Sequence, residues 1–174
     1  RQRQMCIRDC HDTHALTVDF SDCQDCHEDV EEAREIRFEP EGVDPVDYDG
    51  DGDVTEPIYD EIATFKADLL AKIKVYAAET AGTAIAYSPV RFPYWFVDAN
   101  GNGEADPDER DRYVAWTPNL LRAAYNYQYA SKDPGVYIHN PDYILQVLYD
   151  SLEAIGGAEA VASYNRAPVA ASGS

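Results

Sequence analysis

Cys23-Gln24-Asp25-Cys26-His27 is the stretch of this 174-residue chain that decides how its N-terminal part is organised. The C-x-x-C-H pattern is typical of covalent c-type haem attachment. Two thiols at this spacing reach the vinyl groups of one porphyrin, and the histidine that follows lies under the ring, where it binds the iron. The pattern therefore predicts a haem on Cys23 and Cys26, with His27 as its proximal ligand.

A longer copy of the pattern precedes it, as Cys6-Ile7-Arg8-Asp9-Cys10-His11. The two motifs together use all four cysteines of the chain and two of its four histidines. We expect a second haem on Cys6 and Cys10, with His11 as its proximal ligand. The extra residue between these cysteines must bulge for both thiols to reach the porphyrin.

Two other interpretations of the four cysteines stay open. Their spacing, C-x3-C-x12-C-x2-C, is close to that of a zinc ribbon. The same residues could instead form two disulfides in a secreted chain. A four-cysteine zinc site needs no histidine, whereas here a histidine directly follows each second cysteine. We therefore favour two haem c groups.

The two histidines outside the motifs, His14 and His139, are candidates for the distal iron ligands. On a short helix, His14 and His11 point the same way and cannot hold opposite faces of one haem. We expect His14 to serve the haem on His27, which leaves His139 for the haem on His11. Either ligand can also come from a neighbouring copy of the chain. The alternative for each is an ordinary histidine without iron; Met5, the only thioether, is poorly placed because a motif cysteine follows it directly.

A stretch in the second half of the chain fits the calcium loop of an EF-hand position by position. Its expected oxygen ligands are Asp98, Asn100, Asn102, the backbone carbonyl of Glu104, Asp106 and Glu109. Gly103 permits the turn at position 6, and Glu109 at position 12 can bind with both oxygens. The alternative is an acidic surface turn.

A similar acidic loop lies earlier in the chain. Its expected calcium ligands are Asp47, Asp49, Asp51 and Asp53. Position 12 is Ile58, which cannot bind a hard cation, so Asp60 or Glu61 must take that role if the loop binds Ca²⁺. The sequence thus predicts one calcium ion and allows a second, in lone loops that staple the fold.

Apolar periodicity predicts a mainly α fold with extensive irregular loops. One helix is expected over 58–79. Thr117 and Asn140 are expected to cap two more, each with proline at its first position. Residues 84–97 are expected to be extended and buried. We expect 1–30, the dihaem attachment segment, to fold with 31–174 as one domain organised by the haems.

The formal net charge of −19 excludes several function classes. Nucleic acid and anionic lipid are not expected as partners, because binding to either requires clustered Lys and Arg. No apolar run reaches about 18 residues, so no membrane span is expected. No signal peptide is visible, yet haem attachment of this type takes place outside the cytoplasm. We expect a trimmed or incompletely known start and an extracellular or cell-surface location, with the periplasm as the alternative.

Three stretches resemble the C-terminal part of multihaem c-type cytochromes of respiring prokaryotes: 92–103 (Phe-Pro-Tyr-Trp-Phe-Val-Asp-Ala-Asn-Gly-Asn-Gly), 116–128 and 133–141. The resemblance covers most of 44–155, and His139-Asn140-Pro141 is its most specific point. It implies that His139 is a distal haem ligand. Some members of this family polymerise into conductive extracellular filaments, in which a histidine of one subunit ligates a haem of its neighbour.

These features predict an electron carrier with two bis-histidine haems and no enzymatic activity. Iron with two imidazoles has no open position for a substrate. The expected partners are other redox proteins, extracellular electron acceptors, or further copies of the chain in a filament. A haem protein with one open iron site and a calcium-dependent interaction module are the alternatives.

Overall fold

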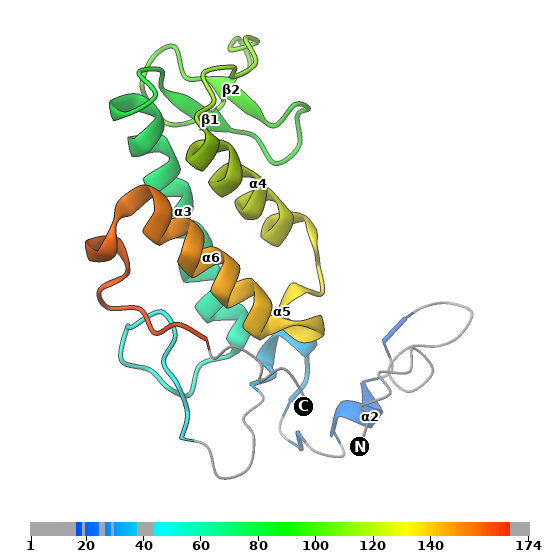
Figure 1. Ribbon diagram of the computed structural model, residues 1–174. Helices are drawn as coiled ribbons and strands as arrows, with labels where there is room; N and C mark the ends of the chain where they lie inside the picture. Colours follow the sequence, from blue (N-terminus) through cyan, green and yellow to red (C-terminus); the bar gives the residue numbers. More distant parts are fainter. Residues whose placement is uncertain (1–16, 19, 25–26, 29, 38–43, 168–174) are drawn as a thin grey trace, which may run out of the picture.

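A computed structural model describes residues 17–18, 20–24, 27–28, 30–37 and 44–167. Within these residues, three long helices pack against one another: α3 (Ile58–Glu79), α4 (Pro118–Lys132) and α6 (Pro141–Gly156). They form the body of the molecule, and irregular loops connect them (Figure 1). The mainly α fold with extensive loops is therefore confirmed, whereas its organisation by haem stays a prediction.

The hydrophobic core lies where the apolar faces of the three helices meet. Its largest side chains with almost no exposed surface include Phe65, Leu69, Ile73, Leu120, Ile144, Leu145, Leu148 and Leu152. They recur at steps of three and four along the helices, as the predicted faces require. Each buried side chain of this size stabilises the fold by about 1.5–3 kcal/mol.

The ends of the helices follow the sequence signals with one exception. The hydroxyl of Thr117 accepts a hydrogen bond from the backbone N–H of Leu120 at 3.3 Å, which confirms the predicted cap of α4. Asn140 precedes α6, but its side chain forms no cap hydrogen bond. Asn140 at the N-cap and Pro141 at the first helical position are as predicted, but the side-chain bond is missing because Asn140 has a ψ of 67°, whereas Thr117 has the extended ψ of 160° that lets a cap side chain reach the first N–H groups.

A short hairpin covers one end of the helices. Strand β1 (Ile85–Tyr87) pairs antiparallel with β2 (Trp95–Val97), with Ile85 opposite Val97. The residues between the strands are not buried as expected, since Val90 is 89% exposed and Phe92 is 82% exposed. The two prolines of this stretch explain the difference, because a proline cannot donate to a strand ladder and the chain leaves the sheet there.

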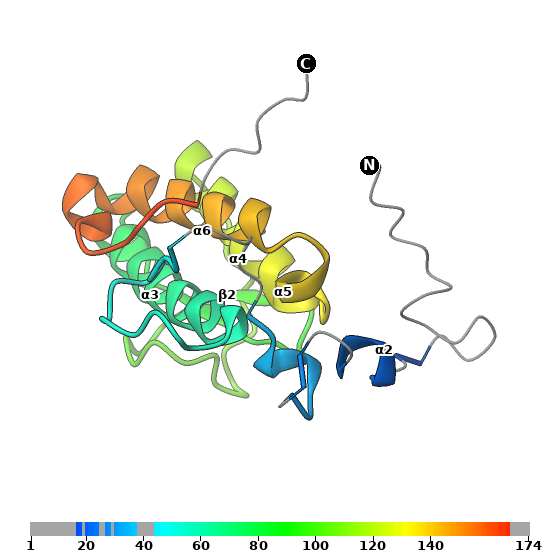
Figure 2. The same cartoon turned by 90° about the horizontal axis from the view of Figure 1, so that it is seen from below.

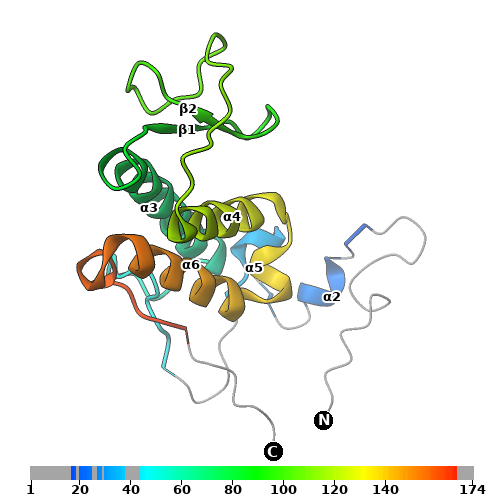
Figure 3. The ribbon, with the colours of Figure 1, turned by 45° about the horizontal axis from the view of Figure 1, so that its top comes forward.

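The opposite end of α3 gathers segments that are far apart in the sequence. The short helix α5 (Val136–His139) and the 3-10 helix η1 (Ala33–Glu35) both contact α3 there (Figures 1 and 3). The four-residue helix α2 (Ser21–Gln24) lies on the side of the body where α5 lies, and the view from below in Figure 2 shows this most directly. In the described part of the chain, no helix has both the length and the apolar character that crossing a bilayer requires.

Candidate functional site

The described part of the C-x-x-C-H motif forms a helical turn. The backbone N–H groups of Cys23 and Gln24 donate to the carbonyl of Phe20, and the N–H of His27 donates to the carbonyl of Cys23 at 3.0 Å. Residues four apart on a helical turn share one face. Cys23 and His27, both half-buried, therefore emerge on one face, as a thiol and an imidazole that act on the same porphyrin must.

Most of the other predicted haem residues lie outside the described residues. These are Cys6, Cys10, His11, His14 and Cys26. The first motif, its proximal histidine and the role of His14 therefore stay predictions. The zinc and disulfide alternatives also stay open, because each needs cysteines of this group.

The remaining candidate ligand, His139, is the last residue of α5 and is exposed. Among the described residues, none forms a hydrogen bond with its imidazole. A pocket of about 190 Å³ lies beside it, lined by Tyr129, Asp133, Val136, His139, Asn140, Tyr143 and Ile144. His139 thus lies at the corner between α5 and α6, and its role as an iron ligand stays a prediction.

Two ring contacts connect the helix of His139 to the segment that follows the haem motif. The ring of Tyr137 on α5 meets that of Tyr59 on α3 edge to face, with 5.2 Å between centroids. The guanidinium of Arg34 on η1 lies 5.9 Å from the centroid of the Tyr59 ring. The chain leaving the C-x-x-C-H motif therefore lies at the end of the body that carries His139.

The second acidic loop (98–109) has the internal geometry of a calcium loop. Asp98 at position 1 accepts from the N–H groups of Gly101 and Gly103, at 2.6 and 2.7 Å. Asn100 accepts from the N–H of Asn102 at 2.9 Å, and Asn102 accepts from that of Glu104 at 2.7 Å. The side chains at positions 1, 3 and 5 thus turn inward, toward the centre that a cation would occupy.

The remaining predicted ligands close this loop. Both Asn100 and Asn102 donate their side-chain N–H groups to Asp106, at 2.7 and 2.8 Å. Glu109 is only 8% exposed, and its two oxygens accept from the N–H groups of Ala99 and Asp106, at 2.6 and 3.2 Å. These hydrogen bonds link the predicted side chains to one another and to the backbone of the loop.

The first acidic loop (47–56) repeats the same hydrogen bonds. Asp47 accepts from the N–H groups of Gly50 and Gly52, at 2.6 and 2.9 Å. Asp49 accepts from Asp51, and Asp51 from Asp53, at 3.1 and 2.7 Å. The glycines at positions 4 and 6 have positive φ in both loops: 78° and 99° for Gly50 and Gly52, and 75° and 79° for Gly101 and Gly103. The two loops therefore share one backbone conformation over their first positions.

Glu61, and not Asp60, faces the first acidic loop. Asp60 is exposed, whereas Glu61 on α3 has no exposed surface. One oxygen of Glu61 accepts from the N–H groups of Tyr48 and Asp49, at 2.7 and 2.8 Å. Glu109 bonds to the N–H at position 2 of its own loop in the same way, so Glu61 takes the closing role at three positions beyond the usual one.

Carboxylate oxygens crowd in the first acidic loop as a metal site would require. Oxygens of Asp47, Asp49 and Glu61 lie within 4.8 Å of one another, and so do oxygens of Asp49, Asp51 and Glu56. Asp53 belongs to neither group: it is exposed and accepts from the N–H and hydroxyl of Thr55, at 2.8 and 2.7 Å. In an EF-hand, its position provides a backbone carbonyl and not a side chain.

Burial and the close approach of the carboxylates in this loop raise the pKa values of three of them. Burial and the neighbouring charges of Asp49 and Glu61 raise the pKa of Glu56 to about 7. Burial raises the pKa of Asp49, and the Thr64 hydroxyl and the Asp51 N–H lower it by less. Burial also raises the pKa of Glu61, although Arg37 lowers it. Without a cation, the folded loop disfavours its own negative charges.

Arg37 is a residue of this site that the sequence analysis did not find. It donates from one nitrogen to Glu61 at 2.8 Å and to the carbonyl of Glu56 at 2.7 Å, and from another to the carbonyl of Val46. Its side chain is only 11% exposed. Glu56 was missed as well, since it occupies position 10, which is not a ligand position in the EF-hand pattern. No local signal in the sequence distinguishes Arg37 from Arg34, which lies three residues before it.

The chain was also compared with known proteins. It is 28% identical over 137 residues to the C-type polyheme cytochrome OmcB of Geobacter sulfurreducens, an alignment that covers 64% of this chain and 18% of OmcB. It is 29% identical over 99 residues to the C-type polyheme cytochrome OmcC of the same organism, which covers 51% of this chain and 13% of OmcC. The chain thus spans less than a fifth of the length of these relatives. No family model matches the chain, and neither does any solved structure. The similarity supports the expectation of a multihaem c-type cytochrome.

Proposed function

We propose that the chain is an electron carrier that holds two haem c groups outside the cytoplasm. The similarity to two polyhaem cytochromes supports electron transport over enzymatic activity. The observation that carries the proposal is the hydrogen bond from the N–H of His27 to the carbonyl of Cys23, since this helical spacing favours a thiol and an imidazole on one face within a C-x-x-C-H motif. Haem bound there would supply an iron that cycles between two oxidation states.

The proposed ligands follow from the positions of the histidines. His27 and His11 hold the irons from the side of their own motifs. His139, exposed at the corner between α5 and α6, is the distal ligand of one iron, and His14 that of the other. With two imidazoles on each iron, the chain's own residues exclude small-molecule ligands from both.

The proposed setting is the cell surface or the extracellular space. The partners are redox proteins or extracellular electron acceptors, which exchange electrons with the haems without chemical change of the chain. A second arrangement is a homopolymer, in which His139 of one copy ligates a haem of the next. The exposure of His139 on the surface of the body is compatible with a ligand bond within or between copies.

We also propose that the second acidic loop binds Ca²⁺, and that the first acidic loop binds a second ion. All the side-chain atoms that would bind the ions are oxygens, which hard cations prefer as ligands. The inward-turned groups of both loops and their shared backbone conformation support this role. The ions would stabilise the fold around the haems and take no part in electron transfer.

Intact-mass measurement of the denatured, reduced holoprotein tests the haem proposal. The wild-type chain should retain two haem masses, and C23A/C26A and C6A/C10A should each retain one. Reduction opens disulfides and denaturation releases zinc, so neither alternative leaves a haem mass on the chain. A wild-type chain without covalent haem would refute the proposal. Carbon monoxide should bind poorly to the reduced protein, and tight binding would instead show an open iron site.

A further inference from the structure

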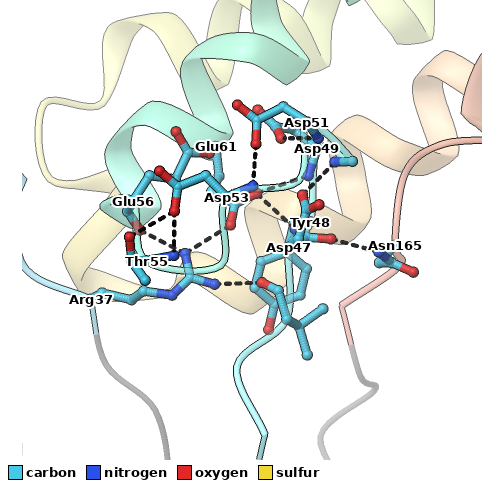
Figure 4. Close-up of polar contacts among 12 residues, drawn as sticks. Arg37, Asp47, Tyr48, Asp49, Asp51, Asp53, Thr55, Glu56, Glu61 and Asn165 are labelled. Carbon is cyan, nitrogen blue, oxygen red and sulfur yellow. Dashed lines mark hydrogen bonds and ion pairs between the residues drawn. The ribbon is translucent and has the colours of Figure 1, made fainter.

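Helix α3 and two segments that are distant from it in the sequence meet at the first acidic loop. The loop leads directly into α3, which contributes Glu61. Arg37 reaches it from the segment that follows the haem motifs. Asn165 reaches it from the C-terminal segment: its backbone N–H donates to the carbonyl of Tyr48 at 2.9 Å, and its side chain donates to that of Asp47 at 2.6 Å. Figure 4 shows Arg37 on one side of the loop and Asn165 on the other.

The C-terminal segment also packs directly on the loop. A β-carbon at Gly50 would lie 2.0 Å from the carbonyl oxygen of Ser163, so only glycine fits this close approach. Gly50 has a φ of 78°, which glycine adopts without strain. The backbone at position 4 is therefore enclosed between the carboxylates and the C-terminal segment.

The interior of the loop has polar atoms without partners. Asp49 is only 5% exposed, and its Oδ2 has no hydrogen-bond partner among the described residues. Oε1 of Glu56 is buried without a partner in the same way. Asp49 is also the residue shared by the two groups of clustered oxygens. Buried carboxylate oxygens without partners are costly, and a cation among them removes that cost.

We infer that the first acidic loop binds a Ca²⁺ ion that clamps two distant segments onto α3. The ligands are carboxylates of Asp47, Asp49, Asp51, Glu56 and Glu61. An all-oxygen set with more than one negative charge and no nitrogen or sulfur is suited to calcium. This inference rests on the proposed calcium role and deepens it, because it gives the ligands and the segments that the ion holds.

The clamp acts through residues that contact both the ion's ligands and the distant segments. Glu61 is a ligand and accepts from Arg37, so an ordered Glu61 holds the segment after the haem motifs. The carbonyls of Asp47 and Tyr48, which accept from Asn165, lie in the backbone between the first two ligands. The second acidic loop differs in its partners: its side-chain hydrogen bonds join residues within 98–109, its Asp98 N–H donates to the carbonyl of Ala84 at 3.1 Å, and Glu104 pairs with Tyr87 of the hairpin.

The test uses calcium-stripped holoprotein titrated with Ca²⁺ alone, with binding followed by calorimetry. The wild type should bind two ions, and D98N should retain the clamp ion. D49N should weaken the clamp site by about tenfold or more, because affinity follows the charge of the ligands. D53N is the matched control: it removes the same charge from the same loop at a position without a side-chain ligand, and it should keep both ions. E56Q provides a second variant if D49N does not fold.

Hydrogen exchange on the same samples reports the clamp. At a free Ca²⁺ concentration 100 times the Kd, exchange in peptides covering 30–37 and 160–167 should slow by up to about 100-fold, because binding only to the closed form stabilises it by that factor. At this Ca²⁺ concentration the protection should persist in D98N and D53N and fall by about tenfold or more in D49N and E56Q, in proportion to their weaker binding. An unchanged affinity of the clamp site in both D49N and E56Q, or binding without protection of these peptides, would overturn the inference. The haem count of the same samples tests the proposed function separately.

Discussion

The imidazole of His139 lies against the backbone of Gly135. A β-carbon at Gly135 would come within 2.5 Å of Cε1 and 2.7 Å of Nδ1 of that ring. Gly135 has a φ of −107°, which any residue can adopt, so the backbone does not require glycine there. The absence of a side chain at position 135 therefore serves the placement of the imidazole.

G135A should displace His139 without unfolding α5. If His139 ligates iron, the low-spin spectrum of one haem should shift or acquire a high-spin component, while the other haem remains unchanged. I138A is the control, since it removes a partly exposed side chain from the same helix and leaves the ring position open. An unchanged spectrum in G135A, with the structure intact by circular dichroism, would speak against ligation by His139.

H139A should leave one iron five-coordinate and high-spin, and the other low-spin. We assign His139 to the haem on His11. H139A should therefore also make the iron high-spin when it is combined with C23A/C26A, which retains only that haem. N140A, which changes the adjacent exposed residue of the pocket, should behave as wild type. Two low-spin haems in H139A would remove His139 from the ligand set. If instead a filament dissociates in H139A, the ligand bond crosses between copies.

Features that depend on neighbouring residues in the sequence were predicted correctly. The apolar faces of the three helices and the cap at Thr117 were predictable, because burial and local backbone hydrogen bonds depend on residues close in sequence. The same holds for the inward-turned positions of both acidic loops. The loop pattern also indicated that Ile58, at position 12, cannot bind a cation, and that Asp60 or Glu61 must provide the closing carboxylate instead.

What the sequence could not predict depends on contacts between distant residues. The choice of Glu61 over Asp60 follows from the face of α3 that packs on the loop. Arg37 and Asn165 reach the loop from segments far along the chain, and no local pattern marks them. The exposed middle of the hairpin was missed because apolar residues there suggested burial, whereas the two prolines prevent strand pairing.

E109Q should weaken calcium binding at the second acidic loop more than any other single substitution there. Glu109 is buried, and position 12 can provide two oxygens to the ion. We expect an affinity loss of about tenfold or more, because ligand charge sets the affinity. D108N is the control, since it removes an exposed charge at a position that provides no ligand. Equal affinity of E109Q and D108N, or a thermal stability of the wild type that chelation does not change, would contradict the stapling role.

R37A should destabilise the calcium-free holoprotein far more than R34A. Arg37 pairs with Glu61 at 2.8 Å, with 11% and 0% of the two side chains exposed. Removing one partner of a buried ion pair typically costs about 3–5 kcal/mol, because the other charge stays buried and unpaired. Arg34 pairs with Glu32 at 2.7 Å, but these side chains are 61% and 58% exposed. An exposed pair contributes about 0–1 kcal/mol, so R34A serves as a charge-matched control.

Urea unfolding followed by circular dichroism measures this difference, since covalent haem would stay on the chain throughout. The free energy of unfolding of R37K should lie between those of R37A and the wild type. Lysine keeps the charge, but it cannot donate from two nitrogens to Glu61, the carbonyl of Glu56 and that of Val46 at once. Equal losses for R37A and R34A would mean that Arg37 does not anchor the segment that follows the haem motifs. A loss confined to R37A would show that one buried arginine holds this segment on α3 even before calcium binds.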